Sequence, residues 1–402
     1  VWAVLVAERK AIEVGDVPRF EVSVDSLNLS IAGQSILTKG GKSAELMDRS
    51  PLERLNQRLA SLSDEDLAWQ YKLLDMVLPP KNSTNTCDKS KTKASSPEAL
   101  RTEALRLAES LSAFTIEDKE GMAWLSLDMD HDSLRARIAI AGTDLYAGAT
   151  GTALALAAAA RETKHQQLAE LAARSFDTFT VTSSVSSNAN VGLAGLGGES
   201  YGLAIGGRLL GREDLIDRGA KHLLQLKQRS LAGVRSADII HGLAGWLLAA
   251  LAVDEMTRHI GKSSDLASAI NEVAQELRRR QGNNGSWLND YEVGLCGYAH
   301  GASGIAWALV RHGHCFDEPI SISAAEAAFR YEDGWFDQQQ GNWPDLRRVT
   351  AACAKTCRLP FLFSWCHGSP GILLAREASE RLGCDINDAS KGILQRARQA
   401  LE

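Results

Sequence analysis

Five glycine cassettes of the form Gly-x-x-Gly each stand just before a run rich in alanine, leucine or isoleucine. The copies begin at Gly148, Gly195, Gly242, Gly301 and Gly368. Their first glycines are separated by 47, 47, 59 and 67 residues, so each interval is long enough for two helices. Two glycines three positions apart remove side chains from one face of a helix start and let neighbouring backbones approach closely. The pattern predicts a repeat of helical hairpins whose buried helix starts crowd around one centre.

The composition excludes several classes of function. Charged residues make up 23% of the 402 residues and hydrophobic residues 45%, which suits a globular protein with a large core. A net charge of −6, with no long basic face, argues against nucleic-acid binding through phosphate contacts. The longest apolar run, about residues 242–253, is too short to cross a bilayer. Seven cysteines without a signal peptide favour a reducing interior, and therefore a cytoplasmic location.

The residues upstream of the repeats have a different sequence pattern, without glycine cassettes followed by apolar runs. Residues 20–31 alternate apolar and polar side chains, which predicts one half-buried strand preceded by a turn at residues 16–18. Ser50 and Ser63 each have the character of an N-cap that starts an amphipathic helix, and the second helix should end near residues 78–80. This part of the chain is therefore predicted to contain both helix and strand.

A polar stretch without periodicity, residues 81–96, is expected to be a linker. It separates a small α/β segment, residues 1–80, from a mainly α-helical domain, residues 97–402. Ser96 should cap the first helix of that domain, and a short hairpin is expected to turn at residues 118–121.

The residues in front of three cassettes carry side chains suited to catalysis. Asp144 lies four residues before the first cassette, His300 directly before the fourth, and Cys366 two residues before the fifth. If the repeats place these positions around one centre, an acid, an imidazole and a thiol converge there. Thiolate and imidazole are ligands that suit Zn²⁺, and a catalytic zinc site keeps one coordination position open. These residues predict an active site that could hold a metal ion.

Four segments resemble the signature segments of lanthionine synthetase C-like cyclases. They are DLYAGATG at residues 144–151, GYAHGASGIAWAL at 297–309, GNWPDLRR at 341–348 and SWCHGSPGI at 364–372. The resemblance covers roughly residues 97–402. It implies an α/α toroid of helical hairpins that closes thioether rings in ribosomally made peptides, and the partner it implies is a precursor peptide with a leader.

The resemblance also implies roles for the three candidate residues. Cys366 becomes a zinc ligand, His300 the acid/base residue, and Asp144 an acidic partner in the same cavity. Zinc would lower the thiol pKa of a substrate cysteine, and the thiolate would add to dehydroalanine or dehydrobutyrine. His300 could protonate the resulting enolate, and Asp144 could orient the imidazole or handle the thiol proton.

A further segment, residues 8–20, resembles the end of the dehydratase domain of class II lanthipeptide synthetases, in which a kinase-like dehydratase precedes the cyclase. On this resemblance we expect the natural protein to be longer at both ends. The ATP and Mg²⁺ site of the dehydratase is expected upstream of Val1. The remaining zinc ligands, in a Cys-His-Gly or Cys-Cys-Gly segment, are expected beyond Glu402.

Other residues near the cassettes are interpreted mainly as structural, with packing, capping or loop anchoring favoured over ligation or catalysis. These residues are Tyr146, Asp238, His241, Cys296, Trp343, Asp345, Arg347, Cys353, Cys357, Trp365 and His367, while Cys87 belongs to the linker. Asp144 also has a structural interpretation, because aspartate is a common N-cap, but the resemblance favours catalysis.

Two other functions compete with peptide cyclisation. The toroid could be a non-catalytic scaffold that binds peptides or proteins, with Cys366 an ordinary thiol. It could also be an enzyme that adds the thiol of glutathione to an alkene. The dehydratase-like segment, residues 8–20, favours lanthipeptide synthesis over both, because a stand-alone scaffold needs no dehydratase.

Overall fold

A computed structural model describes most of the chain. The described residues are 2–15, 17–31, 33–37, 40–41, 46–78, 96–117, 121–130, 135–178, 190–228, 231–289, 292–350 and 358–401. The chain divides into two compact units, residues 1–88 with 134–136 and residues 89–133 with 137–402, and each is described by itself. Nearly all of the expected linker, residues 81–96, lies outside the described residues.

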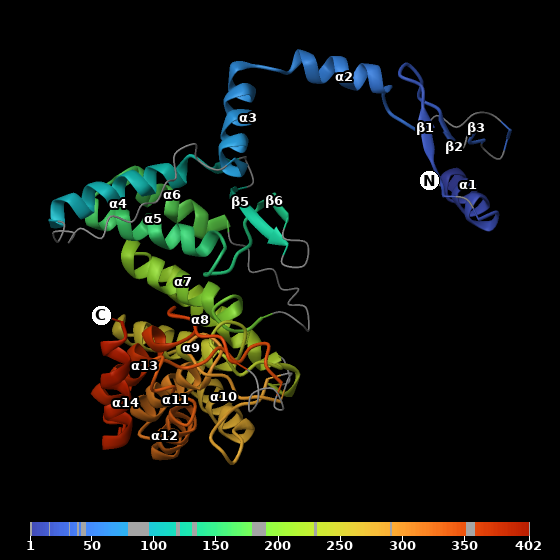
Figure 1. Cartoon of the computed structure of the whole chain (residues 1–402). Coiled ribbons are helices and arrows are strands. Elements are labelled where there is room, and N and C mark those ends of the chain that lie inside the picture. The colour runs from blue at the N-terminus through green and yellow to red at the C-terminus, as the bar shows by residue number, and fades with distance from the viewer. Residues whose placement is uncertain are drawn as a thin grey trace. The chain divides into compact units, whose positions relative to one another are not determined.

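The first unit combines helices with a small antiparallel sheet (Figure 1). Its elements are α1 (Trp2–Glu13), β1 (Phe20–Val22), β2 (Leu29–Ile31), β3 (Gln34–Ser35), α2 (Pro51–Ala60) and α3 (Asp64–Val77), with strand order β1-β2-β3. The N-caps predicted at Ser50 and Ser63 are confirmed, since each hydroxyl accepts a backbone hydrogen bond from the residue three positions later.

The single strand expected over residues 20–31 is wrong. Two short strands form instead and pair antiparallel, with Phe20 opposite Ile31. The chain turns between them, where the amide of Ser26 donates to the carbonyl of Ser23 at 3.0 Å and the hydroxyl of Ser26 accepts from the amide of Asn28 at 3.0 Å. These local hydrogen bonds compete with an extended ladder, which is why the alternation of side chains does not continue as one strand.

The second unit opens with α4 (Pro97–Ser112), which Ser96 caps as expected. A sheet of β4 (Thr115–Glu117), β5 (Met122–Asp130) and β6 (Arg135–Ile140) follows, in that order, and the division into units counts the first two residues of β6 with the first unit. The strand pairing of the expected hairpin is confirmed, because Glu117 on β4 pairs with Met122 on β5, whereas turn residues 118–120 lie outside the described residues.

Five helical hairpins follow in the described part of the chain, with loops and two short 3₁₀ helices, Leu224–Gln228 and Leu231–Gly233, between them. Their inner helices are α5 (Ala149–Thr163), α7 (Leu196–Leu210), α9 (Leu243–His259), α11 (Ala302–Phe316) and α13 (Ser369–Arg381). Their outer helices are α6 (Gln166–Thr178), α8 (Glu213–Leu223), α10 (Leu266–Arg280), α12 (Pro319–Asp333) and α14 (Asp388–Gln399). Each inner helix packs against the next inner helix and against its own outer helix (Figure 1). This arrangement confirms the predicted mainly α-helical fold of the α/α-toroid type.

The sequence explains why the inner and outer helices differ. Inner helix α9 is buried on nearly all sides. Outer helix α10 buries one stripe, formed by Leu266, Ile270, Val273 and Leu277 at helical spacing, and turns charged residues outward. In the described part of the chain, no helix combines the length and the apolar character needed to cross a membrane.

The glycine cassettes hold the inner helix starts together. The first glycine of each cassette is the N-cap of its inner helix. A Cβ atom at Gly245 would lie 2.9 Å from the Cα atom of Gly192 in the preceding repeat, and one at Gly371 would lie 2.8 Å from the Cβ atom of Tyr298. The second glycines therefore allow the close approach between repeats that their spacing predicted.

Candidate functional site

The turns that precede the third, fourth and fifth inner helices are joined by backbone hydrogen bonds. The amide of Ile239 donates to the carbonyl of Ala299 at 3.1 Å, and the amide of Ala299 donates to the carbonyl of Cys366 at 3.2 Å. These bonds bring together the residues directly before the three cassettes, His241, His300 and His367. The three imidazoles stack in series, with ring centroids 5.5 Å apart for the first pair and 5.6 Å for the second.

The central imidazole of this stack is paired with a buried carboxylate. Nδ1 of His300 lies 2.7 Å from Oδ2 of Asp238, and Oδ1 of Asp238 accepts a hydrogen bond from the amide of His241 at 2.7 Å. Burial opposes ionisation of Asp238, but the hydrogen bond and charge of His300 outweigh it and hold the carboxyl pKa below its ordinary value. A carboxylate at Nδ1 fixes the ring and leaves proton exchange to Nε2.

The interpretation of Asp238 as a packing or capping residue is therefore incomplete. Asp238 does cap its turn, through the amide of His241, but the same side chain also orients His300. Its position could have revealed this second role. Asp238 lies four residues before its cassette, the place that Asp144 takes in the first repeat.

Asp144 has the contacts of a turn cap. Its Oδ1 accepts hydrogen bonds from the amides of Tyr146 and Ala147, both at 2.8 Å. It also raises the pKa of nearby Glu199, although burial is the larger cause of that shift. Among the described residues, no hydrogen bond or ion pair joins Asp144 to His300, and a catalytic role for Asp144 stays a prediction.

Cys366 lies half-buried just before α13, beside the histidine stack. Its Sγ is 3.2 Å from the hydroxyl oxygen of Ser364. Arg347 pairs with Asp345 at 2.8 Å, and its pKa is raised mainly by that carboxylate and to a smaller extent by the nearby Cys366. The residue after the cysteine, His367, is only 4% exposed, and burial followed by the charge of Arg347 lowers its pKa to about 4.

Cys366 can serve as one zinc ligand, but the described residues around it do not form a complete set of zinc ligands. Cys366 is neither fully buried nor disulfide-bonded, and cysteine sulfur is a common zinc ligand. The one group of three potential ligands within the described residues consists of Asp238, His241 and His300, and Cys366 is not part of it. Cys353 and Cys357 lie outside the described residues.

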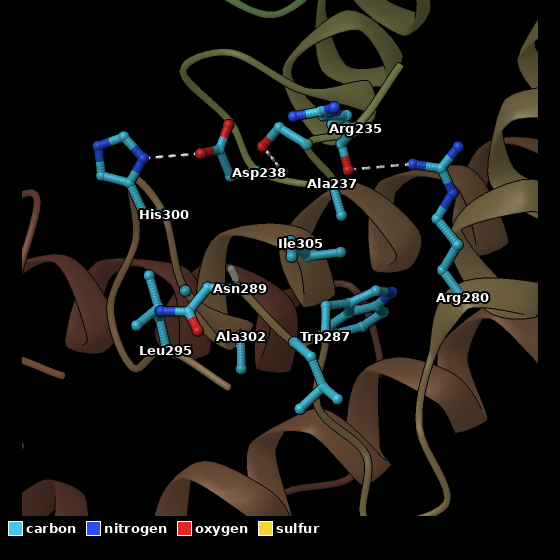
Figure 2. A pocket seen from close by; sticks show the side chains of 13 residues that line it. Arg235, Ala237, Asp238, Arg280, Trp287, Asn289, Leu295, His300, Ala302 and Ile305 are labelled. Atoms are coloured by element: carbon cyan, nitrogen blue, oxygen red, sulfur yellow. Dashed lines mark hydrogen bonds and ion pairs between the residues drawn. The ribbon is translucent and has the colours of Figure 1, made fainter. Parts of the chain in front are cut away.

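A cavity of about 240 Å³ adjoins the Asp238–His300 pair (Figure 2). Its lining combines apolar and polar side chains, among them Trp287, Leu295, Ile305, Arg235 and Asn289. Arg280 supports one wall, because its guanidinium donates to the carbonyl oxygens of Leu231 and Val234, both at 2.6 Å. The cavity is a mixed polar and apolar space beside the Asp238–His300 pair, so it can offer a ligand both hydrogen-bonding groups and apolar contacts.

Several residues interpreted from the sequence as structural have the burial or the hydrogen bonds of packing residues. Cys296 is 3% exposed, and burial raises its thiol pKa. Trp343 is buried and donates from Nε1 to the carbonyl of Glu332 at 2.9 Å. Tyr146 and Trp365 instead form an exposed aromatic pair, with ring centroids 6.2 Å apart, that links the turns before the first and fifth inner helices.

The helical hairpins and the residues before their cassettes belong to a segment that matches a known protein family. A sequence model of the family described as "Lanthionine synthetase C-like protein" matches residues 139–402, which include all five hairpins, the His300–Asp238 pair and Cys366. The chain belongs to the lanthionine synthetase C-like family. The expected resemblance is thereby confirmed, and residues 139–402 form a lanthionine synthetase C-like cyclase domain.

The chain is similar to two solved structures at low sequence identity. The chain is similar to "Nisin cyclase", with 15% sequence identity, a TM-score of 0.47, and coverage of 75% of this chain and 74% of that chain. It is also similar to a possible member of the GH105 family from Salmonella enterica subsp. enterica serovar Paratyphi A str. ATCC 9150. In that case the identity is 12%, the TM-score is 0.31, and the match covers 81% of this chain and 100% of that chain.

Proposed function

We propose that this lanthionine synthetase C-like chain closes lanthionine and methyllanthionine rings in a ribosomally made precursor peptide that carries a leader. In this reaction the thiol of a peptide cysteine adds to dehydroalanine or dehydrobutyrine, which forms a C–S bond. The observation that carries the proposal is the contact of His300 with Asp238 in a turn that is hydrogen-bonded to the turn of Cys366. An acid/base candidate that lines a cavity and a candidate metal ligand thus lie on turns that are hydrogen-bonded to each other.

The proton transfers follow from the geometry of this pair. Addition of the thiol leaves an enolate whose α-carbon needs a proton, and Nε2 of His300 is the proposed donor. Asp238, held at Nδ1, stabilises the imidazolium before the transfer and keeps the ring in position. The proton lost by the thiol equals the proton gained by the α-carbon, so ring closure needs no net proton exchange with solvent.

Cys366 is the proposed ligand from this chain for Zn²⁺. When bound, zinc would supply a lowered thiol pKa for the substrate cysteine, which makes the thiolate available at neutral pH. Ser364, at 3.2 Å from Sγ, would hold the ligand in place. Asp144 is retained as a second candidate acid/base residue.

The dehydratase assignment of the first unit and the cellular location are also proposals, which rest on the sequence. The first unit, with its short sheet and helices, is proposed to be the end of a dehydratase domain, and the intact protein would then dehydrate serine and threonine with ATP and Mg²⁺. A cytoplasmic location follows from cysteine usage.

A thiol assay tests the proposed reaction. The full chain would be incubated with Zn²⁺ and a synthetic peptide that contains one dehydroalanine and one cysteine. Free thiol would be followed by alkylation and mass spectrometry. We expect loss of alkylation without a change in peptide mass, faster than in a reaction without protein. Unchanged alkylation with intact peptide binding would favour a scaffold. In a parallel reaction that also contains glutathione, a glutathione adduct formed in preference to the ring would favour the glutathione-adding enzyme.

A further inference from the structure

Three side chains on two neighbouring turns lie close together, and the proposed reaction gives a role to only two of them. The candidate ligand atoms of Asp238, His241 and His300 all lie within 4.8 Å of one another. Oδ2 of Asp238 is 2.7 Å from Nδ1 of His300 and 3.9 Å from Nδ1 of His241. The carboxylate oxygen therefore faces both imidazoles, and the proposed proton transfers give His241 no role.

The chemistry of this donor set suits a transition-metal cation. Two imidazoles and a carboxylate bind Zn²⁺, Co²⁺ and Ni²⁺ well, with metal–nitrogen distances of about 2.0–2.1 Å for zinc. Such distances require the three ligand atoms to draw closer together than they now lie. Most of that movement can come from His241, whose side chain is 45% exposed, while Asp238 is 12% exposed and held by its turn.

The surroundings leave room for the rest of a coordination shell. Asp238 and His300 both line the 240 Å³ cavity, so water molecules could occupy the positions that the protein does not fill (Figure 2). The exposed ring of His241 offers an entry path from solvent. Arg235 brings a positive charge to the cavity, but its side chain is exposed, and solvent screens that charge.

We propose that Asp238, His241 and His300 form a second site for a divalent transition-metal cation, separate from the proposed zinc ligand Cys366. A cation bound to Nδ1 of His300 displaces the hydrogen bond to Asp238. If the proposed cyclisation is correct, this binding also inhibits it, so that excess Zn²⁺ acts against the zinc that supports the reaction. The inhibition rests on the proposed function, whereas the binding site does not.

Metal binding can be measured without any assay of cyclisation. The full chain carrying Cys366→Ser, freed of metal by a chelator, would be titrated with Co²⁺ in equilibrium dialysis and by visible absorption. We expect this variant to bind one Co²⁺ in a His241-dependent manner, with d–d bands that Zn²⁺ displaces. Added His241→Ala should weaken binding by at least about tenfold. Added His259→Ala, an exposed histidine at the end of α9, should leave binding unchanged.

Two results would overturn the proposal. One is the absence of bound Co²⁺ in the Cys366→Ser chain, and the other is equal affinity with and without His241. Thermal unfolding followed by circular dichroism would establish that each variant is folded, and His241→Gln, which preserves the size of the side chain, repeats the comparison if the alanine variant unfolds. Cobalt bound through His241 in a chain that closes no ring would support the site and reject the proposed reaction.

Discussion

Asp238 and His300 are separated by 62 positions in the sequence, yet Oδ2 of the first lies 2.7 Å from Nδ1 of the second. The contact forms because the amide of Ile239 donates to the carbonyl of Ala299, which aligns the turns of two successive repeats. The result is an oriented imidazole next to the turn that carries Cys366.

Replacement of His300 tests the acid/base assignment. We expect His300→Ala to lower the rate of thiol loss from the dehydroalanine peptide by about 10²–10⁴-fold, because general acid catalysis contributes that much. Peptide binding, measured by fluorescence anisotropy, should change little. A His259→Ala control should keep its rate. A His300→Ala rate within a few-fold of the parent would contradict the assignment.

A comparison of two asparagine variants decides which acid assists His300. Asp238→Asn should lower the rate of ring closure more than Asp144→Asn, because only Asp238 is hydrogen-bonded to His300 within the described residues. Asp144→Asn keeps an oxygen that can accept from the amides of Tyr146 and Ala147, so it should change the free energy of unfolding by less than about 1 kcal/mol. Equal rate losses with unchanged stability would show that Asp144 takes part in the chemistry.

The close packing of the inner turns predicts a large penalty at Gly371. A Cβ atom there would clash with the carbonyl of Trp365 and lie 2.8 Å from the Cβ of Tyr298. Gly371→Ala should therefore lower the free energy of unfolding by about 1–3 kcal/mol, as overpacking does. Gly392→Ala is the matched control, since Gly392 lies in α14 with no atom within 4 Å of its added Cβ. That change should stabilise the chain by about 0.5–1 kcal/mol. Urea titrations of both variants measure the difference, and equal effects would refute the packing argument.

Two buried histidines predict a loss of stability at mildly acidic pH. Burial lowers the pKa of His222 and of His312 to about 4, below the unfolded value of 6.5. As the pH falls, the unfolded chain therefore binds a proton at each histidine before the folded chain does. The contribution of the two neutral histidines to the free energy of unfolding is complete above pH 6.5 and is lost as the pH drops from 6.5 towards 4. Each group accounts for up to about 3 kcal/mol at the lower end.

Urea denaturation between pH 7 and pH 4.5 measures this loss. His312 is the better residue to replace, since its two ring nitrogens each lie 2.9 Å from a polar oxygen, of Ser321 and of Asn271. His312→Gln should reduce the pH dependence, whatever its effect on stability at pH 7. If the free energy of unfolding depends on pH as steeply in this variant as in the parent chain, His312 does not titrate in this range.

The positions of the helices could be predicted because their signals are local. Gly242 and Gly301 each start an inner helix as N-cap, and the apolar run that follows specifies burial on nearly all sides. The strand predicted at residues 20–31 failed for a local reason as well, because Ser26 offered turn hydrogen bonds that the alternation of side chains did not reveal.

The sequence alone determined the repeat of hairpins, the inner helix starts and the candidate residues His300 and Cys366, since each depends on residues close together in the chain. The resemblance favours Asp144 as the acidic partner and leaves Asp238 as a structural residue, although the local sequence around the two is alike. Both lie four residues before a cassette, and both accept a hydrogen bond from the amide just before that cassette. Only the tertiary structure decided that Asp238 meets His300, because that contact depends on which repeats are adjacent in space. The glycines predict that neighbouring helix starts pack closely, but their spacing along the chain does not specify which side chains of those turns meet.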